Sequence, residues 1–111
     1  METFERDLLY TSDEVHSFLL EYFQSLKDIR IEMTQFAETK QWDNLKKVVH
    51  SLKSSALIVG AQELSSNCES FEELDFDSTT EKKLISSWHE INISIERLTY
   101  LLEMELSNNE T

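Results

Sequence analysis

The sequence predicts an all-α protein: an antiparallel up-down-up-down four-helix bundle with a short extra helix at its N-terminus. Its 111 residues include no proline and a single glycine, so little in the chain interrupts helices. Apolar residues recur at steps of three and four in four segments separated by short polar stretches. Long helices with short connections favour antiparallel packing, and a chain of this length is enough for one domain with one core.

The N-terminal part predicts a short helix over about residues 2–9, followed by a long one. Thr11 and Glu14 have the spacing of a capping box, in which a hydroxyl and a carboxylate satisfy free amides at the start of a helix. The long helix should run from there to about Thr39. The apolar residues at helical spacing within it are Val15, Phe18, Leu19, Tyr22, Phe23, Leu26, Ile29, Met33, Phe36 and Ala37.

Asp43 is the expected N-cap of the next helix, which ends near Val59. Gly60 then falls where a helix end favours a left-handed residue, so its expected role is structural. Ser55 is expected to permit close helix packing. The residues predicted to share the core face of this helix are Leu45, Val48, Leu52, Ser55, Ala56 and Val59.

Two further helices complete the bundle, over about residues 61–74 and from about residue 81 onward. Residues 75–79 form a polar connection, and Ser78 with Glu81 is a second candidate capping box. The expected bundle core spans about residues 12–105, and residues 107–111 form a polar tail. The apolar stripes of these two helices are Ala61, Leu64, Cys68, Phe71 and Leu74, then Leu84, Trp88, Ile91, Ile95, Leu98 and Leu102.

Composition and charge exclude several classes of function. A net charge of −12 argues against binding nucleic acid. No apolar run approaches the roughly 20 residues of a membrane span, and the acidic N-terminus does not resemble a signal peptide. The single cysteine, Cys68, rules out an internal disulfide and suits a reducing compartment. We expect a cytoplasmic monomer. No metal site is expected, since the histidines are far apart in the sequence.

His50 is the main candidate for a functional residue. At about 100° per residue it points away from the predicted core face. Its neighbours on that outer side are Lys46, Lys47, Lys53 and Ser54. Lys53 follows at i+3 and therefore lies beside the imidazole on the helix surface. A histidine surrounded by lysines and small residues is well placed to carry a negatively charged group.

The segment His50–Ser55, with Gly60-Ala61 ten residues after the histidine, resembles the signature of histidine-containing phosphotransfer (HPt) domains. The family pattern is His-x-Leu-Lys-Gly-Ser, followed by Gly-Ala or Gly-Leu. The resemblance covers most of the chain, and its specific part spans residues 50–74. Residues farther along that match the family's usual types are Leu64, Cys68, Phe71 and Glu72.

The resemblance implies a phosphorelay. His50 would accept a phosphoryl group, on Nε2, from the aspartate of a receiver domain and pass it to another receiver. Lys53 would stabilise the phosphoryl charge, with Lys46 and Lys47 in support. The expected partners are response-regulator receivers and the receiver of a hybrid sensor kinase. The chain would have no kinase activity and no cofactor of its own, because the Mg²⁺ belongs to the receiver. The chain's start close to the first helix favours a free shuttle.

Two residues depart from the family pattern, and one more is ambiguous. Ser54 replaces the common glycine, and its small side chain leaves room for a receiver. Glu72 stands where some members have glutamine. It would either accept from Nδ1–H and present Nε2 outward, or favour a protonated ring and lower the nucleophilic fraction. Leu57 also projects toward the His50 side, as part of a docking patch or as an ordinary exposed leucine.

Two other functions are compatible with this sequence. The first is a helical adaptor or inhibitor that binds a receiver or kinase without being phosphorylated. The second is a structural bundle that associates with itself. Transfer of label from a phosphorylated receiver distinguishes the phosphorelay protein from both.

Overall fold

The computed structural model describes residues 12–109 and contains four helices and no strand within that range. They are α2 (Ser12–Glu38), α3 (Trp42–Ile58), α4 (Gln62–Glu72) and α5 (Glu81–Asn109). The all-α class is therefore confirmed. The helix expected over residues 2–9 and the Thr11 side of the first capping box lie outside the described residues. At the other end, α5 continues to Asn109, beyond the expected start of the polar tail at residue 107.

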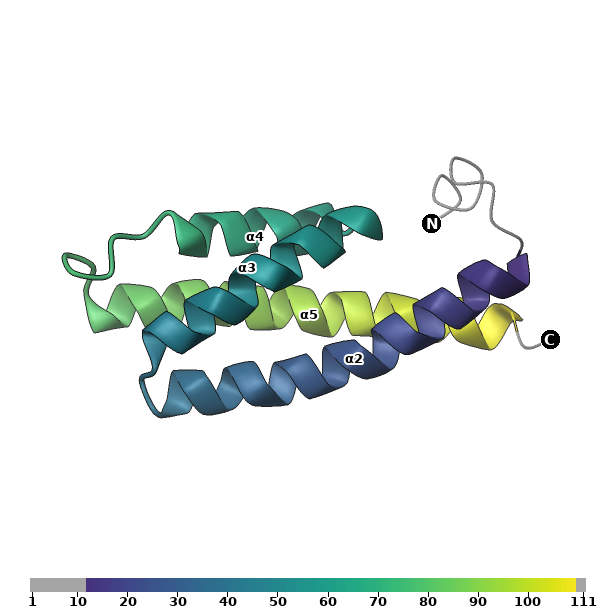
Figure 1. The fold of residues 1–111 in the computed structure, drawn as a ribbon, viewed down its shortest axis with the longest axis horizontal. Coiled ribbons are helices and arrows are strands. Elements are labelled where there is room, and N and C mark those ends of the chain that lie inside the picture. Colours follow the sequence, from purple (N-terminus) through teal and green to yellow (C-terminus); the bar gives the residue numbers. More distant parts are fainter. Residues whose placement is uncertain (1–11, 110–111) are drawn as a thin grey trace.

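Each helix packs chiefly against two others. α3 contacts α2 and α4, and α5 contacts the same two helices from the other side. Figure 1 shows the chain turning back after each helix, with α2 and α5 extending past α3 and α4 at the end where α2 begins. The four helices thus surround one core. None of the described helices is long and apolar enough to cross a membrane.

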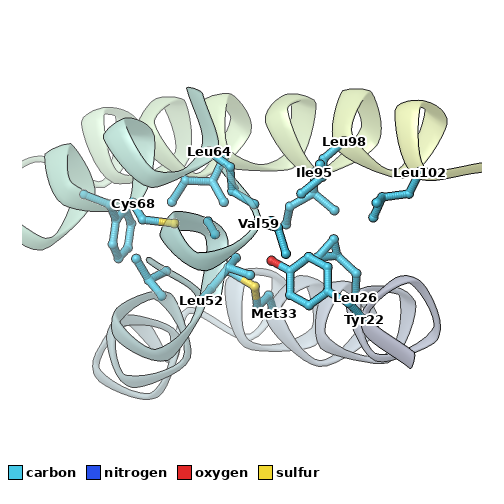
Figure 2. Packing of buried hydrophobic residues seen from close by; sticks show 14 of the residues in the cluster. Tyr22, Leu26, Met33, Leu52, Val59, Leu64, Cys68, Ile95, Leu98 and Leu102 are labelled. Carbon is cyan, nitrogen blue, oxygen red and sulfur yellow. The ribbon is translucent and has the colours of Figure 1, made fainter. Parts of the chain in front are cut away.

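The core is made from the apolar stripes of all four helices. Figure 2 shows Leu52 of α3, and Val59 directly after α3, among side chains of the other three helices. These are Met33 of α2, Leu64 of α4 and Ile95 of α5. Burial of such side chains contributes about 1.5–3 kcal/mol each before the entropy of folding is counted. The fully buried members with the largest side chains are Phe71, Leu19, Leu26, Met33, Leu45, Leu52, Leu64, Ile91, Ile95 and Leu102.

The core face of α3 is rotated slightly from the expected one. Val49 is fully buried, whereas Val48 and Ser55, both expected on this face, are only half-buried. Ser55 also does more than permit close packing, because its hydroxyl donates to the carbonyl of Leu52 (3.0 Å) and lies 3.3 Å from the hydroxyl of Tyr22 on α2. This rotation matters for His50, which follows Val49 directly.

The predicted N-cap at Asp43 is wrong. Helix α3 begins at Trp42, Gln41 occupies the N-cap position, and Asp43 lies in the first turn. The reason is the end of α2, where Lys40 takes a left-handed conformation (φ 58°) and the amide of Gln41 donates to the carbonyl of Phe36 (2.8 Å). This tight reversal places the chain in position to start α3 before Asp43 is reached.

The second capping box is also wrong. Thr80, not Ser78, caps α5: the amide of Lys83 donates to the Thr80 hydroxyl (3.2 Å), and the helix begins at Glu81. Ser78 belongs to a turn after α4, in which its amide donates to the carbonyl of Asp75 (3.1 Å). Because this turn holds Ser78 and Thr79 by hydrogen bonds to the carbonyl of Asp75, α5 begins only at Glu81.

Gly60 has the expected structural role. Its φ is +77°, its amide donates to the carbonyl of Leu57 (3.1 Å), and the next amide, of Ala61, donates to that of Ala56 (2.8 Å). This pair of bonds is a Schellman motif that closes α3. An added Cβ at Gly60 would meet no atom within 4 Å, so glycine is favoured by backbone conformation and not by space.

Candidate functional site

His50 projects from the outer side of α3. Val49 before it is fully buried, and Leu45 and Leu52 anchor the same helix in the core. Because these three fix the rotation of α3, the imidazole is directed to solvent, and its side chain is 69% exposed. The ring is open to an approaching molecule.

Glu72, the last residue of α4, orients the ring. Its Oε2 lies 2.8 Å from His50 Nδ1. The buried Phe71 beside it holds this end of α4 against the core. An ionised carboxylate can only accept a hydrogen bond, so the short contact requires the proton to be on Nδ1. In the neutral ring this leaves the lone pair on Nε2, the nitrogen that does not face Glu72.

The same carboxylate also binds Lys53. Its other oxygen, Oε1, lies 3.0 Å from Lys53 Nζ, and the Glu72 side chain is only 17% exposed. Burial acts to raise the pKa of Glu72, but the contacts with Lys53 and His50 outweigh it, so the pKa lies below its usual value. The contact with Glu72 in turn raises the pKa of Lys53. Glu72 is therefore an ionised bridge between the imidazole and the ammonium group.

Cys68 lies one turn before Glu72 on α4 and is fully buried. Burial raises the pKa of its thiol to about 12, with a further contribution from the negative charge of Glu72. The thiol is thus uncharged at neutral pH. It fills space beneath the site, which agrees with its place on the predicted apolar stripe.

Lys46 and Lys47 border the site differently. Lys46 is half-buried and its Nζ lies 5.0 Å from the centre of the Phe76 ring, while Lys47 is exposed. Both line an open hollow of about 630 Å³ beside His50 and Glu72. Asp43 lines the same hollow, so the hollow is lined by both positive and negative side chains.

Phe76 was missed in the sequence, where it stands in a stretch expected to be only a polar connection. It is half-buried and packs edge-on against Phe71, with 5.4 Å between the ring centres. The ammonium of Lys46 lies over its ring in a cation–π contact. The signal in the sequence that could have indicated a packing role was a single aromatic residue between two aspartates, Asp75 and Asp77.

Ser54 and Leu57 lie farther along the outer side of α3. Both are exposed, Leu57 by 61%. At i+4 and i+7 they share the His50 side of the helix. The structure thus brings Glu72 into direct contact with both His50 and Lys53, and it leaves Ser54 and Leu57 exposed on the His50 side of α3. Within residues 12–109, no group of three or more His, Cys, Asp or Glu side chains could hold a metal ion.

The sequence model of the Hpt domain family matches residues 17–108, which include every residue of this site. Comparison with curated proteins and with solved structures gives no match. The chain belongs to the Hpt domain family. Domains of this family carry out histidine phosphotransfer in phosphorelays and interact with the receiver domains of response regulators.

Proposed function

We propose that this chain accepts a phosphoryl group on Nε2 of His50 from the aspartate of one receiver domain and passes it to the aspartate of another. The observation that carries the proposal is the exposed ring, with Nδ1 bound to Glu72 and Nε2 left as the free nucleophile. The neutral imidazole attacks phosphorus in line with the departing carboxylate oxygen. Receiver-bound Mg²⁺ balances the charge on the phosphoryl oxygens, and this chain supplies no cofactor.

Lys53 is the basic group proposed to stabilise the transferring phosphoryl group. Its ammonium is bound to the same Glu72 carboxylate that contacts Nδ1 of His50, which holds Lys53 on the side of α3 that carries the imidazole. Lys46 and Lys47 add positive charge at the rim of the hollow. In the free protein each such contact is weak, because water screens it. The contribution grows when a docked receiver excludes water.

Ser54 and Leu57 are proposed to form part of the receiver-docking surface. A receiver has to bring its aspartate within a few ångströms of the ring, and the small Ser54 at i+4 leaves room for it. Leu57, exposed at i+7, offers apolar contact area. The partners are response-regulator receivers and the receiver of a hybrid sensor kinase. We also propose that the chain forms an antiparallel up-down-up-down bundle and acts as a cytoplasmic monomer.

The test is transfer of labelled phosphate. A receiver is phosphorylated on its aspartate with labelled acetyl phosphate and Mg²⁺ and then mixed with the chain. We expect an acid-labile, base-stable label on the wild type and none on His50→Gln, with equal helical circular dichroism in both. A label that persists in His50→Gln overturns the proposal. Binding of the receiver without any transfer to the wild type identifies an adaptor instead.

A further inference from the structure

Two lysines on the His50 side of α3 are held by different kinds of partner. Lys53 is bound to the Glu72 carboxylate, with 3.0 Å between Nζ and Oε1. Lys46 is held by the ring of Phe76, whose centre lies 5.0 Å from its Nζ. Among the described residues, no carboxylate lies at ion-pair distance from Lys46. The charge of Lys53 is therefore partly balanced before a phosphoryl group arrives, whereas the charge of Lys46 is not.

We propose that Phe76 is a positioning residue, whose ring holds the unpaired ammonium of Lys46 beside His50 so that it binds the phosphoryl oxygens during transfer. This role rests on the proposed function. An aromatic ring attracts a cation through the negative potential of its face, and it carries no formal charge. The ring can therefore fix a lysine in place and leave its full positive charge available to an anion.

Hydrogen bonds in the loop between α4 and α5 keep the Phe76 ring in this place. The side chain of Asp75 accepts from the amide of Asp77 (3.1 Å), and the Asp75 carbonyl accepts from the amide of Thr79 (2.8 Å). The ring itself packs edge-on against Phe71, which is fully buried. The contact with Lys46 is thus anchored to the core at the end of α4.

Lys46 occurs one helical turn before His50 and lies on the same side of α3. Both residues line the open hollow of about 630 Å³, so Lys46 borders the space into which the imidazole opens. In the acceptance step the Nε2 lone pair forms the N–P bond, the O–P bond of the aspartyl phosphate breaks, and its electron pair leaves with the aspartate oxygen. No proton moves. The phosphoryl oxygens stay negative throughout, and a cation beside them lowers the barrier.

Carboxylates near Lys46 are the reason why an uncharged partner matters. Asp43 precedes Lys46 by three residues and lines the same hollow. Asp75 and Asp77 lie on either side of Phe76 in the sequence. In a pair with any of these aspartates, the ammonium would face a carboxylate instead of the incoming phosphoryl group. The ring holds the ammonium away from such pairs.

The test compares transfer from a phosphorylated receiver to the wild type, Phe76→Leu, Phe76→Tyr and Lys46→Ala, at equal helical circular dichroism. We expect Phe76→Leu to slow transfer about two- to fivefold, because a partly exposed cation–π contact biases the ammonium toward its place by that factor. Lys46→Ala should slow transfer more. Phe76→Tyr keeps the face of the ring and should transfer at close to the wild-type rate. When Lys46→Ala and Phe76→Leu are combined, the leucine should cause no further loss.

Helix α2 offers a matched control, because Lys27 lies 4.3 Å from the centre of the Phe23 ring in a contact of the same kind. Phe23, like Phe76, is half-buried. Phe23→Leu should leave the transfer rate unchanged. Equal rates in Phe76→Leu and wild type overturn the inference, as does an equal slowing in Phe23→Leu. A slow Phe76→Tyr also contradicts it, and so does a further loss in the double variant, which would indicate a packing role independent of the lysine.

A measurement on the unphosphorylated wild type guards against a variant that fails to fold. Protons over the face of an aromatic ring are shifted upfield. Proton NMR should therefore find the ε-methylene of Lys46 upfield of that of its exposed neighbour Lys47. Equal shifts for the two lysines would overturn the inference and leave the proposed function intact. Absence of any label on the wild type would contradict the proposed function, and the inference with it.

Discussion

Lys53 Nζ lies 3.0 Å from Glu72 Oε1, so the basic residue of the signature is joined to α4 as well as placed beside His50 on α3. The contact crosses the interface between the two helices and holds the ammonium near the ring. The role proposed for Lys53, to stabilise the charge of the phosphoryl group, therefore depends on the end of α4.

Replacing Lys53 with alanine should slow phosphoryl transfer about tenfold or less while leaving helicity unchanged. The loss reflects one charge contact that strengthens when the receiver excludes water. The measurement is a transfer time course at low and high salt. Lys27→Ala is the control, because Lys27 lies on α2 over the Phe23 ring. An unchanged rate at every salt concentration would remove Lys53 from the site.

Glu72 should make stability depend on acid pH. Its folded-state pKa is below the ordinary value, so its contribution is present above the unfolded value of about 4.3 and is lost as pH falls through the lower folded value. Between pH 6 and pH 3 the wild type should therefore lose more free energy of unfolding than Glu72→Gln does, by about 1 kcal/mol or less. Urea unfolding at both pH values measures this difference. Equal losses in the two proteins would contradict the ionised bridge.

The contact of Lys46 with Phe76 should appear as an energetic coupling. A cation over an aromatic ring contributes about 0.5–1 kcal/mol at a partly exposed site. A double-mutant cycle of Lys46→Ala and Phe76→Leu, followed by urea unfolding, should return a coupling energy of that size. The leucine preserves apolar bulk against Phe71. Strictly additive losses would mean that the ring does not bind the ammonium in solution.

Gly60 and Lys40, which both have a left-handed backbone conformation, should respond to substitution in opposite directions. Gly60→Ala should lower the free energy of unfolding by about 1 kcal/mol, because alanine is strained at a φ of +77° although the space is open.

Lys40→Gly should raise the free energy of unfolding by up to about 1 kcal/mol, because Lys40 is strained at its φ of 58° and glycine would not be. The exposed ion pair between Lys40 and Glu81 offsets little of this gain. A stabilised Gly60→Ala, or a clearly destabilised Lys40→Gly, would contradict the turn geometry.

Several features of the fold and the site could be predicted from the spacing of residues along single helices. The all-α class, the outward direction of His50 and the end of α3 at Gly60 follow from spacing along single helices. The buried Val49 lies next to the predicted face, where a small rotation of α3 decides which of two adjacent valines enters the core. Periodicity alone does not resolve that rotation.

Features set by contacts between elements could not be predicted in the same way. The N-caps expected at Asp43 and Ser78 were wrong because the preceding turns, through Lys40 and Asp75, determine where each helix starts. The position of Phe76 beneath Lys46 depends on how the loop after α4 folds back. The bridge at Glu72 needs both α3 and α4 in place, because its carboxylate contacts residues of α3 from the end of α4.

The central claim is that the exposed Nε2 of His50 is the atom that takes the phosphoryl group. Phosphorus–nitrogen NMR on the nitrogen-15-labelled chain, after transfer from a phosphorylated receiver, tests it most directly. The account predicts one phosphorus nucleus coupled to His50 Nε2, with the proton still on Nδ1. Phosphorus bonded to Nδ1, or to any residue other than His50, would contradict it.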